Sequence, residues 1–401
     1  MKKVLMLGGA PAQIPAIKKA KEMGLYVITC DYLPNNPGHA YADEYYNVST
    51  TDKEEVLKLA QKLKIDGIVC YASDPSALTA AYVAENMGLP TSPYESVKIL
   101  SNKDLFRAFL SKNGFNTPKA NGYSSVEEAI QELNKYKFPV IIKPVDSSGS
   151  KGVTKLEKNE EKEARKQIEY AMSFSRAKRV IIEEFVEKYG YQIAGDGFSV
   201  DGKLVFRAFA NDHFDTRCKN PYVPVGASWP YDMPNEIHEK IHNEIQRCLT
   251  LLNMKTGAYN FDIRIDKDMN VYLMEIGPRN GGNMIPQVME YTTGINLVEY
   301  TIKAAIGEDC SDLKMQKQEG FWAYYALHSL NNGKFKELYI DKEFEKDNLV
   351  ELHLYVKTGE EISEYIGSNT TVGIMIVKFN SKEEMLDKIE HMDKWVKVVL
   401  Q

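Results

Sequence analysis

The chain has few cysteines, no long apolar run and no excess of basic residues. Its five cysteines are widely spaced, odd in number and form no C-x-x-C pair, which argues against a disulfide framework or a metal knuckle and is typical of a reducing compartment. Its apolar runs fall far short of the ~20 residues that span a bilayer. A net charge of −6 offers no basic surface for nucleic acid. We therefore expect a cytoplasmic protein with no membrane or nucleic-acid partner.

The first part of the chain alternates strands and helices. A length of 401 residues suggests two to four domains. "KVLML", a helix ending at Gly24 and "LYVITCD" are followed by two more helices around the strand "DGIVCY". Such βαβ units predict a parallel sheet that is covered on both faces. The Pro- and Ser-rich segment "LPTSPYES", residues 89–96, predicts a domain boundary.

The rest of the chain has a different pattern of predicted secondary structure. Short strands separated by turns surround one helix at 159–172, and a long amphipathic helix at 235–252 precedes a hairpin at 258–276. The last ninety or so residues read as short strands with one capped helix, "SKEEMLDKIEHM". The pattern predicts an α/β and α+β multidomain protein with an N-terminal parallel βαβ domain and a small β-rich C-terminal module.

A strand followed by a flexible basic loop, "VIIKPVDSSGSKGV" at 140–153, predicts a phosphate site. Lys143 ends the apolar strand, so the sheet aims its ammonium group. The glycines allow backbone N–H groups to approach phosphate oxygens. This is no Walker loop, and a plain hairpin connection is the alternative. The loop residues concerned are Ser147, Ser148, Gly149, Lys151 and Gly152.

Two carboxylates in the hairpin predict a Mg²⁺ site. Symmetric pairing about a turn centred between Asp268 and Met269 places Asp262 opposite Glu275, with Cβ atoms ~5 Å apart. Two carboxylates at that spacing repel each other, and a shared Mg²⁺ removes the repulsion with the oxygen ligands that this ion prefers. An ion pair with Arg264 or Arg279 is the alternative. Arg279 follows Glu275 closely enough to meet charge that builds on a phosphoryl or acyl group.

Two other motifs give weaker signals. "LGGAPAQIPA" joins a strand to a helix but lacks the second and third glycines of a dinucleotide fingerprint; Gly8 and Gly9 either receive a substrate anion or form a packing turn. "HEKIH" at 238–242 matches a zinc-peptidase pattern. Its histidines flank an apolar helix stripe, and no further histidine occurs before His328. We expect no zinc.

Taken in order, these elements resemble the ATP-grasp superfamily, in its biotin-carboxylase-like, carboxylate–amine ligase branch. That branch includes bacterial L-amino-acid ligases and purine-pathway ligases. The resemblance covers nearly the whole chain. It implies a Rossmann-like pre-ATP-grasp domain at 1–95, an ATP-grasp domain at 96–310 with a lid subdomain at about 115–188, and a C-terminal module at 311–401.

The resemblance also implies residue roles. Lys103 and Lys143 hold ATP phosphates, and Lys143 and Arg279 act in catalysis. Residues 147–152 form the lid. Asp262 and Glu275 bind Mg²⁺, or Mn²⁺ in its place. The adenine hinge and the ribose site are implied at Glu183, Glu184, Phe185, Val186 and Gln192.

Two departures from the family pattern stand out. Gln192 replaces a glutamate that often faces the ribose. Gly277 replaces the asparagine of "E-x-N-x-R", which usually supplies a second magnesium ligand; Asn280 or Asn283 are candidate substitutes. The acceptor end of the site is expected around His213, Arg217, Lys219 and Asn280, although solvated loop charges would look the same.

The implied activity is an ATP- and Mg²⁺-dependent ligase. ATP phosphorylates a small-molecule carboxylate, and an amine attacks the acyl phosphate. Two alternatives stay open. A phosphoribosylamine–glycine ligase would need a phosphate site near Gly8, Gly9 and Ser73. A non-catalytic nucleotide-binding protein is supported only by Gln192 and Gly277. A homodimer is the assembly that we consider.

Overall fold

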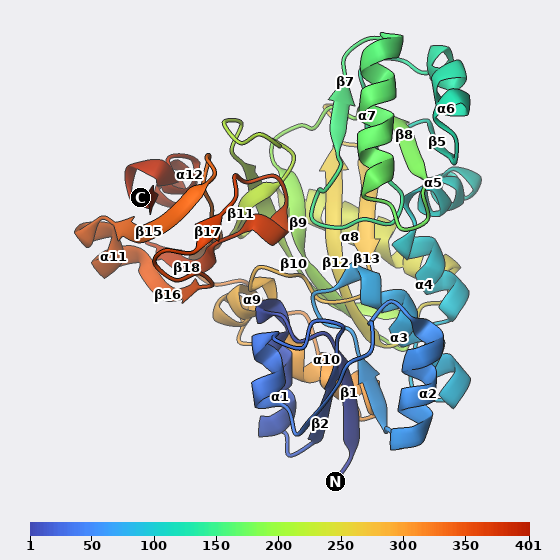
Figure 1. The fold of residues 1–401 in the computed structure, drawn as a ribbon, viewed down its shortest axis with the longest axis vertical. Helices are drawn as coiled ribbons and strands as arrows, with labels where there is room; N and C mark the ends of the chain where they lie inside the picture. Colours follow the sequence, from blue (N-terminus) through green and yellow to red (C-terminus); the bar gives the residue numbers. More distant parts are fainter.

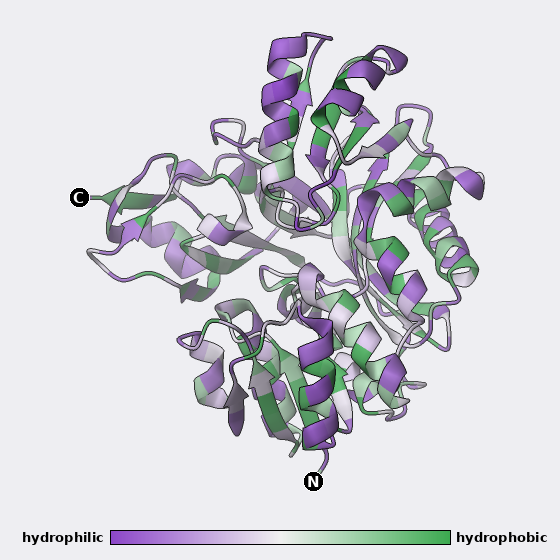
Figure 2. Ribbon diagram, turned by 45° about the vertical axis from the view of Figure 1, so that its right-hand side comes forward, coloured by the Kyte–Doolittle hydropathy of each residue, from purple (hydrophilic) through white to green (hydrophobic).

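The computed structural model describes residues 1–401, and its N-terminal part is a small parallel sheet with helices on both faces (Figure 1). The strand order is β3 (Glu44–Tyr46), β2 (Tyr26–Cys30), β1 (Lys3–Leu7) and β4 (Gly67–Val69). Val4 and Met6 pack beneath α1 (Ile14–Glu22), while Leu5 and Leu7 pack beneath α2 (Lys53–Leu63) and α3 (Asp74–Met87). Both faces of this sheet are therefore apolar, and its strands are coloured mostly as hydrophobic in Figure 2. The predicted βαβ domain is confirmed.

A second sheet lies in the segment that is predicted to form the lid subdomain. After α4 (Tyr94–Ser101) and α5 (Lys103–Lys112), its strand order is β5 (Ala120–Tyr123), β8 (Val180–Glu184), β6 (Val140–Pro144) and β7 (Thr154–Leu156). Helices α6 (Val126–Glu132) and α7 (Glu161–Ser173) cover the face that carries Val140, Ile142 and Ile182. Ser125 caps α6 by accepting from the Glu128 N–H. The opposite face carries Ile141, Lys143 and Glu183 and is left for the site.

The central sheet is antiparallel and runs through eight strands. Its order is β13 (Val271–Gly277), β12 (Gly257–Ile265), β9 (Gln192–Val200), β10 (Lys203–Phe214), β11 (Pro224–Trp229), β14 (Phe321–Leu327), β18 (Gly373–Phe379) and β16 (Leu349–Leu354). The last three strands come from the segment expected to form a separate C-terminal module. The sheet thus continues across residue 310, and the domain division stays a prediction.

The remaining C-terminal elements lie at one side of the molecule (Figure 1). A three-stranded sheet joins β17 (Glu361–Ile362), β15 (Gly333–Ile340) and β19 (Val396–Leu400), with α11 (Lys342–Asn348) and α12 (Lys382–Glu390) beside it. Helix α9 (Ile285–Thr293) packs on the central sheet, and α10 (Leu297–Ala305) packs against α1 through Val298 and Ile302. None of the helices is both long and apolar enough to cross a bilayer.

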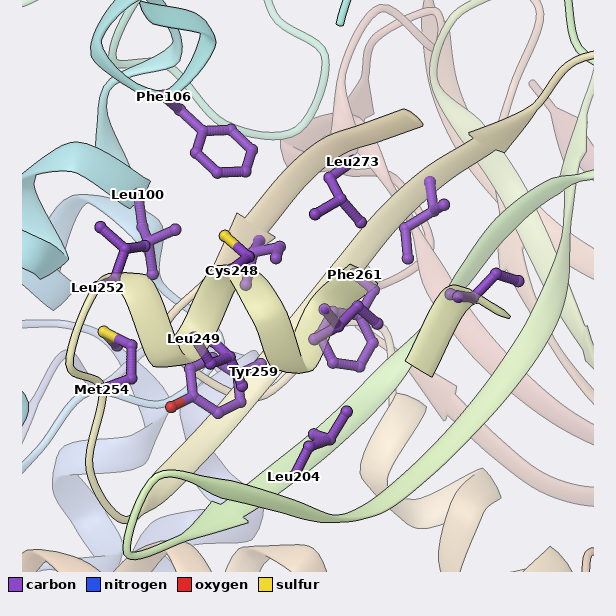
Figure 3. Close-up of a cluster of buried hydrophobic side chains, with 14 of the residues drawn as sticks. Leu100, Phe106, Leu204, Cys248, Leu249, Leu252, Met254, Tyr259, Phe261 and Leu273 are labelled. Carbon is purple, nitrogen blue, oxygen red and sulfur yellow. The ribbon is translucent and has the colours of Figure 1, made fainter. Parts of the chain in front are cut away.

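Helix α8 (Asn235–Leu251) packs against the apolar face of the hairpin β12–β13 (Figure 3). Cys248 and Leu249 pack with Phe261 and Leu273 in the largest apolar cluster. Because side chains alternate across a strand, burial of Phe261 and Ile263 turns Asp262 to the opposite face. Burial of one face of the hairpin therefore decides where its carboxylate points.

The two histidines of "HEKIH" take part in the packing of α8. His238 Nε2 lies 3.3 Å from the carbonyl oxygen of Tyr231, and its ring stacks at an angle on Tyr231 and Phe209. Burial lowers the pKa of both His238 and His242, so both rings are neutral. Neither side chain lines the large cavity described next.

Candidate active site

One cavity of about 990 Å³ lies between the lid sheet, the central sheet and the start of α3. It collects most of the residues predicted for nucleotide, metal and catalysis. Its size and its mixture of apolar and charged walls suit a small-molecule ligand. The predicted residues that line it are Lys103, Lys143, Ser147, Ser148, Gly149, Lys151, Glu183, Phe185, Gln192, His213, Arg217, Asp262, Glu275, Arg279 and Asn283.

The hairpin carboxylates face each other as the sequence predicts. Asp262 is paired with Glu275 in the register of β12 and β13. The turn is centred on Asp268, because Ile265 pairs with Val271. An extra residue, Met274, then bulges out of β13 and shifts the register by one, which restores the predicted pair. The pairing is confirmed, although the turn lies half a residue from its predicted centre.

The environment of these two carboxylates suits a divalent cation. Oδ1 of Asp262 is fully buried and has no hydrogen-bond partner. Burial raises the pKa of Asp262, and Glu275 adds to the rise against the opposing charge of Arg264. Burial alone would raise the pKa of Glu275 too, but Lys103 and Arg279 hold it below its ordinary value. An orphaned buried oxygen beside an ionised carboxylate is the kind of donor set that Mg²⁺ uses.

The two predicted phosphate lysines are each held by a carboxylate. Lys103 Nζ lies 3.1 Å from Glu275 Oε2 and donates to the carbonyl oxygen of Ser147 at 2.9 Å. Lys143 Nζ lies 2.5 Å from Glu183 Oε1. Burial lowers the pKa of Lys143, although Glu183 opposes this. Both ammonium groups therefore enter the cavity from fixed positions on α5 and β6.

Arg107 is a residue that sequence reasoning missed. Its Nε donates to Glu183 Oε2 at 2.9 Å, and its Nη1 donates to the carbonyl oxygen of the bulged Met274 at 2.9 Å. Burial would raise the pKa of Glu183, but Arg107 and Lys143 lower it to about 2. The role of Glu183 at an adenine hinge stays a prediction; its side chain anchors Lys143. The only sequence signal for Arg107 was a charge among the apolar residues of "DLFRAFL".

Only part of the expected adenine hinge lines the cavity. Phe185 lines the cavity, with Lys155 4.6 Å and Arg264 5.3 Å from its ring centre. Glu184 and Val186 do not line it: Glu184 Oε1 accepts from the Lys137 N–H, and the carbonyl oxygen of Val186 accepts from Arg264. These contacts fix the strand end at which an adenine edge would bind.

Gln192 lines the cavity with its amide already engaged. Nε2 donates to Asp212 Oδ2 at 3.2 Å, and Oε1 accepts from Arg264 Nε at 2.9 Å. Burial and the charge of Asp262 raise the pKa of Asp212 well above its ordinary value. The side-chain amide of Gln192 thus joins the Asp212 carboxyl group to the Arg264 guanidinium. A hydrogen bond to ribose would have to use the amide N–H or the oxygen lone pair that these two contacts leave free.

The loop expected to act as a lid lies over the cavity with few anchors. The carbonyl oxygen of Gly149 accepts from the Ser368 N–H at 3.3 Å, and that of Ser150 accepts from Asn220 Nδ2 at 2.9 Å. Gly152 does not line the cavity. Its φ of +74° and its close approach to Phe174 and Pro144 leave no room for a side chain, so it sets the loop's end.

We expect ATP with Mg²⁺ to slow amide hydrogen exchange across residues 147–152 more than in any other segment. The loop is held by only a few hydrogen bonds, among them the one from Lys103 Nζ to the carbonyl oxygen of Ser147, so the free loop should open readily. Exchange monitored by mass spectrometry measures this, with α7 as the internal control. Protection in the free protein as high as that of α7 would contradict the lid assignment.

The acceptor end is only partly assembled from the predicted residues. His213 Nε2 lies 2.8 Å from Ser228 Oγ, and burial lowers the His213 pKa to about 3, so the ring is neutral. Arg217 is held by Asp215 and Asp393. Lys219 pairs with Glu364 outside the cavity. Asn280 is fully buried with its Oδ1 accepting from Thr301, and it does not line the cavity either.

The N-terminal loop does not reach the cavity. Gly8, Gly9 and Ser73 are absent from its lining. The Gly9 N–H donates to the buried carboxylate of Asp31 at 3.2 Å, which also accepts from Asn36. An acidic side chain thus already occupies the turn where an anion was considered. The favoured interpretation is the packing turn.

Asp74, at the start of α3, is a second residue that sequence reasoning missed. It lines the cavity, and its Oδ1 accepts from Arg279 Nε at 2.7 Å and lies 2.5 Å from Nη2. Burial would lower the pKa of Arg279, but Asp74 outweighs this, so the guanidinium stays charged. The sequence offered no signal, since an acidic residue in the first turn of a helix is common.

Known proteins resemble this chain in sequence. Residues 136–287 match the family model of the ATP-grasp domain. Over 344 residues, 80% of this chain, the sequence is 24% identical to the carbamoyl phosphate synthase large chain, C-terminal section, of Aquifex aeolicus (strain VF5). The chain spans 62% of that relative's length, which is less than two thirds.

Two solved structures share the fold over the whole chain. The L-amino acid ligase from Bacillus licheniformis has a TM-score of 0.82 at 19% identity, covering 100% of this chain and 99% of that one. Phosphoribosylglycinamide synthetase from Anaerococcus prevotii has a TM-score of 0.76 at 24% identity, covering 100% of both. The chain therefore carries an ATP-grasp domain, at residues 136–287, within the fold of these two ligases, as the resemblance in its sequence predicted.

Proposed function

We propose that the protein is an ATP-dependent ligase that activates a small-molecule carboxylate as an acyl phosphate for attack by an amine, with release of ADP and phosphate. One observation carries the proposal. The opposed carboxylates of Asp262 and Glu275, the buried lysines Lys103 and Lys143, and Arg279 all line the same cavity. Cationic groups and a metal site around one space are what phosphoryl transfer from ATP requires.

The roles follow from position. Lys103 and Lys143 are fixed by Glu275 and Glu183, so they would meet the phosphates without rearranging. Asp262 and Glu275 would hold Mg²⁺, with Mn²⁺ as an alternative, and the ion would supply charge neutralisation for the phosphates. Arg279 stays charged in a buried site, where it would stabilise the negative charge that grows as the phosphoryl group moves to the carboxylate.

The chemistry beyond the phosphate is proposed in general terms. The carboxylate oxygen attacks the terminal phosphorus of ATP and ADP leaves; the amine then attacks the acyl carbon and phosphate leaves. His213 is neutral and buried in the cavity wall, so it suits binding of a polar group more than binding of an anion. A cytoplasmic location and a homodimer stay predictions; the five unpaired cysteines agree with the former.

The alternative functions are less well supported. A phosphoribosylamine–glycine ligase would need a phosphate site near Gly8, Gly9 and Ser73, yet the Gly9 N–H is taken by Asp31, whose charge would repel a phosphate. A non-catalytic nucleotide-binding protein would have no need for Arg279 or for both carboxylates in the cavity.

The proposal is tested by phosphate release from ATP. Amino acids and other small carboxylates are offered in pairs with amines, and mass spectrometry identifies the product. Release that requires both partners, with an amide formed in step, supports the ligase. ATP binding without release across a panel that includes glycine with phosphoribosylamine would instead favour the non-catalytic alternative.

Replacing Lys143 with methionine should abolish most of the rise in melting temperature that ATP with Mg²⁺ produces. A ligand that binds only the folded state stabilises it, and Lys143 is proposed to hold a phosphate. The variant should also lose stability without ATP, by about 1–3 kcal/mol, because the buried Glu183 keeps only Arg107 as partner. Each variant is therefore compared with its own ligand-free melting temperature.

The control is Lys166→Met, which removes an exposed lysine of α7 in the same subdomain. It should keep the whole ATP-induced shift. A Lys143→Met protein with an unaltered shift would remove Lys143 from the nucleotide site.

A further inference from the structure

The space beside Gly277 is already filled. Gly277 stands where the ATP-grasp pattern usually has asparagine, two residues after Glu275. A Cβ atom at this position would lie 3.1 Å from Asp74 Oδ1 and 3.3 Å from Arg279 Cζ. Both distances are shorter than ordinary van der Waals contact, so even alanine would press on this pair. Backbone conformation does not require the glycine, since its φ lies outside the left-handed region.

The atoms that fill this space hold the arginine firmly. Oδ1 of Asp74 accepts from Nε at 2.7 Å and lies 2.5 Å from Nη2 of Arg279. Nη1 of Arg279 donates to the carbonyl oxygen of Asn280 at 3.0 Å. All three guanidinium nitrogens therefore have partners, and only 9% of the residue is exposed. This fixes the plane of the guanidinium as well as its position.

The carboxylate reaches the site from a different part of the fold. Asp74 is the first residue of α3 in the N-terminal parallel domain, whereas Arg279 follows β13 of the central sheet. The first residue of a helix has a backbone held by the following turn, so its side chain starts from a fixed point. The orientation of Arg279 thus depends on how the N-terminal domain packs against the central sheet.

We propose that Asp74 is the positioning residue for Arg279, and that residue 277 is glycine because a side chain there would displace the Asp74–Arg279 pair. This rests on the proposed function, in which Arg279 meets the moving phosphoryl group. Loss of the asparagine at 277 is then no loss of the site. The Asp74 carboxylate of the N-terminal domain occupies the space beside residue 277, and it orients Arg279 for phosphoryl transfer.

The test measures binding of two ligands to the full chain by calorimetry: ATP with Mg²⁺, and ADP with Mg²⁺ and aluminium fluoride, which mimics a phosphoryl group in transfer. Asp74→Ala should weaken binding of the mimic by about tenfold or more, since small misplacements of a catalytic group are costly, while ATP binding changes less than about twofold. Gly277→Ala should act in the same direction. Asp74→Asn, which keeps an acceptor oxygen, should fall between wild type and Asp74→Ala.

The double variant Asp74→Ala/Gly277→Ala decides the matter, because residues that act through one contact give non-additive effects. It should bind the mimic no more weakly than Asp74→Ala alone. If the two losses multiply, or if Asp74→Ala or Asp74→Asn weakens ATP and the mimic equally, the inference is overturned. Glu95→Ala removes an acidic residue from the first turn of α4 and controls for a general effect on helix ends.

Arg279→Ala separates this inference from the proposed function. If Arg279→Ala loses affinity for the mimic and Asp74→Ala keeps it, only the positioning role fails. If Arg279→Ala also keeps wild-type affinity, or if the wild-type protein binds neither ligand, the proposed function itself is wrong.

Discussion

Replacing Arg279 with alanine is expected to lower kcat by about 10²-fold or more, with little change in the affinity for ATP. The guanidinium is buried and charged, and it is proposed to meet charge that appears only during phosphoryl transfer. Contacts of that kind act on the transition state more than on the bound ground state. Steady-state kinetics with the substrate pair found in the phosphate-release screen measure kcat, and calorimetry measures ATP binding.

Arg165→Ala is the matched control. It removes an arginine that pairs with Glu127 on the surface of the lid subdomain, away from the cavity. Its kcat should equal that of the wild type. An Arg279→Ala protein that loses ATP affinity while kcat is kept would make Arg279 a nucleotide clamp and not a transition-state group.

Replacing Glu275 with glutamine should weaken metal binding by about 10²-fold or more and reduce turnover at low Mg²⁺ accordingly, since even partners of metal ligands cost up to about 10²-fold. The change keeps the size of the side chain but removes one of the two anionic groups of the proposed metal site. The other group, Asp262, has a buried Oδ1 without a hydrogen-bond partner. Lys103 also loses its carboxylate. Electron paramagnetic resonance of bound Mn²⁺, with and without ATP, measures affinity independently of activity.

Asp268→Asn is the control for this hairpin, because Asp268 is an exposed carboxylate in the same turn. It should bind Mn²⁺ like the wild type. Full Mn²⁺ affinity in both Glu275→Gln and Asp262→Asn would place the metal elsewhere. High Mg²⁺ should restore part of the turnover of Glu275→Gln, which a misfolded protein would not do.

Much of the site could be predicted because its signals are local. The alternation of Phe261, Asp262 and Ile263 puts one residue on the far side of a strand from the other two, whatever the rest of the fold does. The same holds for Lys143 at the end of an apolar strand. Glycines in a Ser-rich loop predict mobility without knowledge of the neighbours.

Some correct predictions had incomplete reasons. Asp262 faces Glu275 only because the bulge at Met274 compensates for a turn centred half a residue away. Glu183 is predicted as an adenine contact, which stays a prediction; burial beside Arg107 makes its side chain the anchor of Lys143 as well. A carboxylate's role is set by the cations that tertiary packing brings to it, and those lie far away in sequence.

The sequence by itself determined the parallel N-terminal sheet, the hairpin with its two carboxylates, and the resemblance to ATP-grasp proteins, because each depends on periodicity or on the order of motifs along the chain. Only the tertiary structure decided that Gly8, Gly9, Lys219 and Asn280 stay outside the cavity, that Asp74 lines it, and that Arg107 holds the cavity residue Glu183 in place. Asp74 meets Arg279 across 205 residues of chain. The physical reason is that a buried charge must find its partner through the packing of whole domains, which no local pattern records.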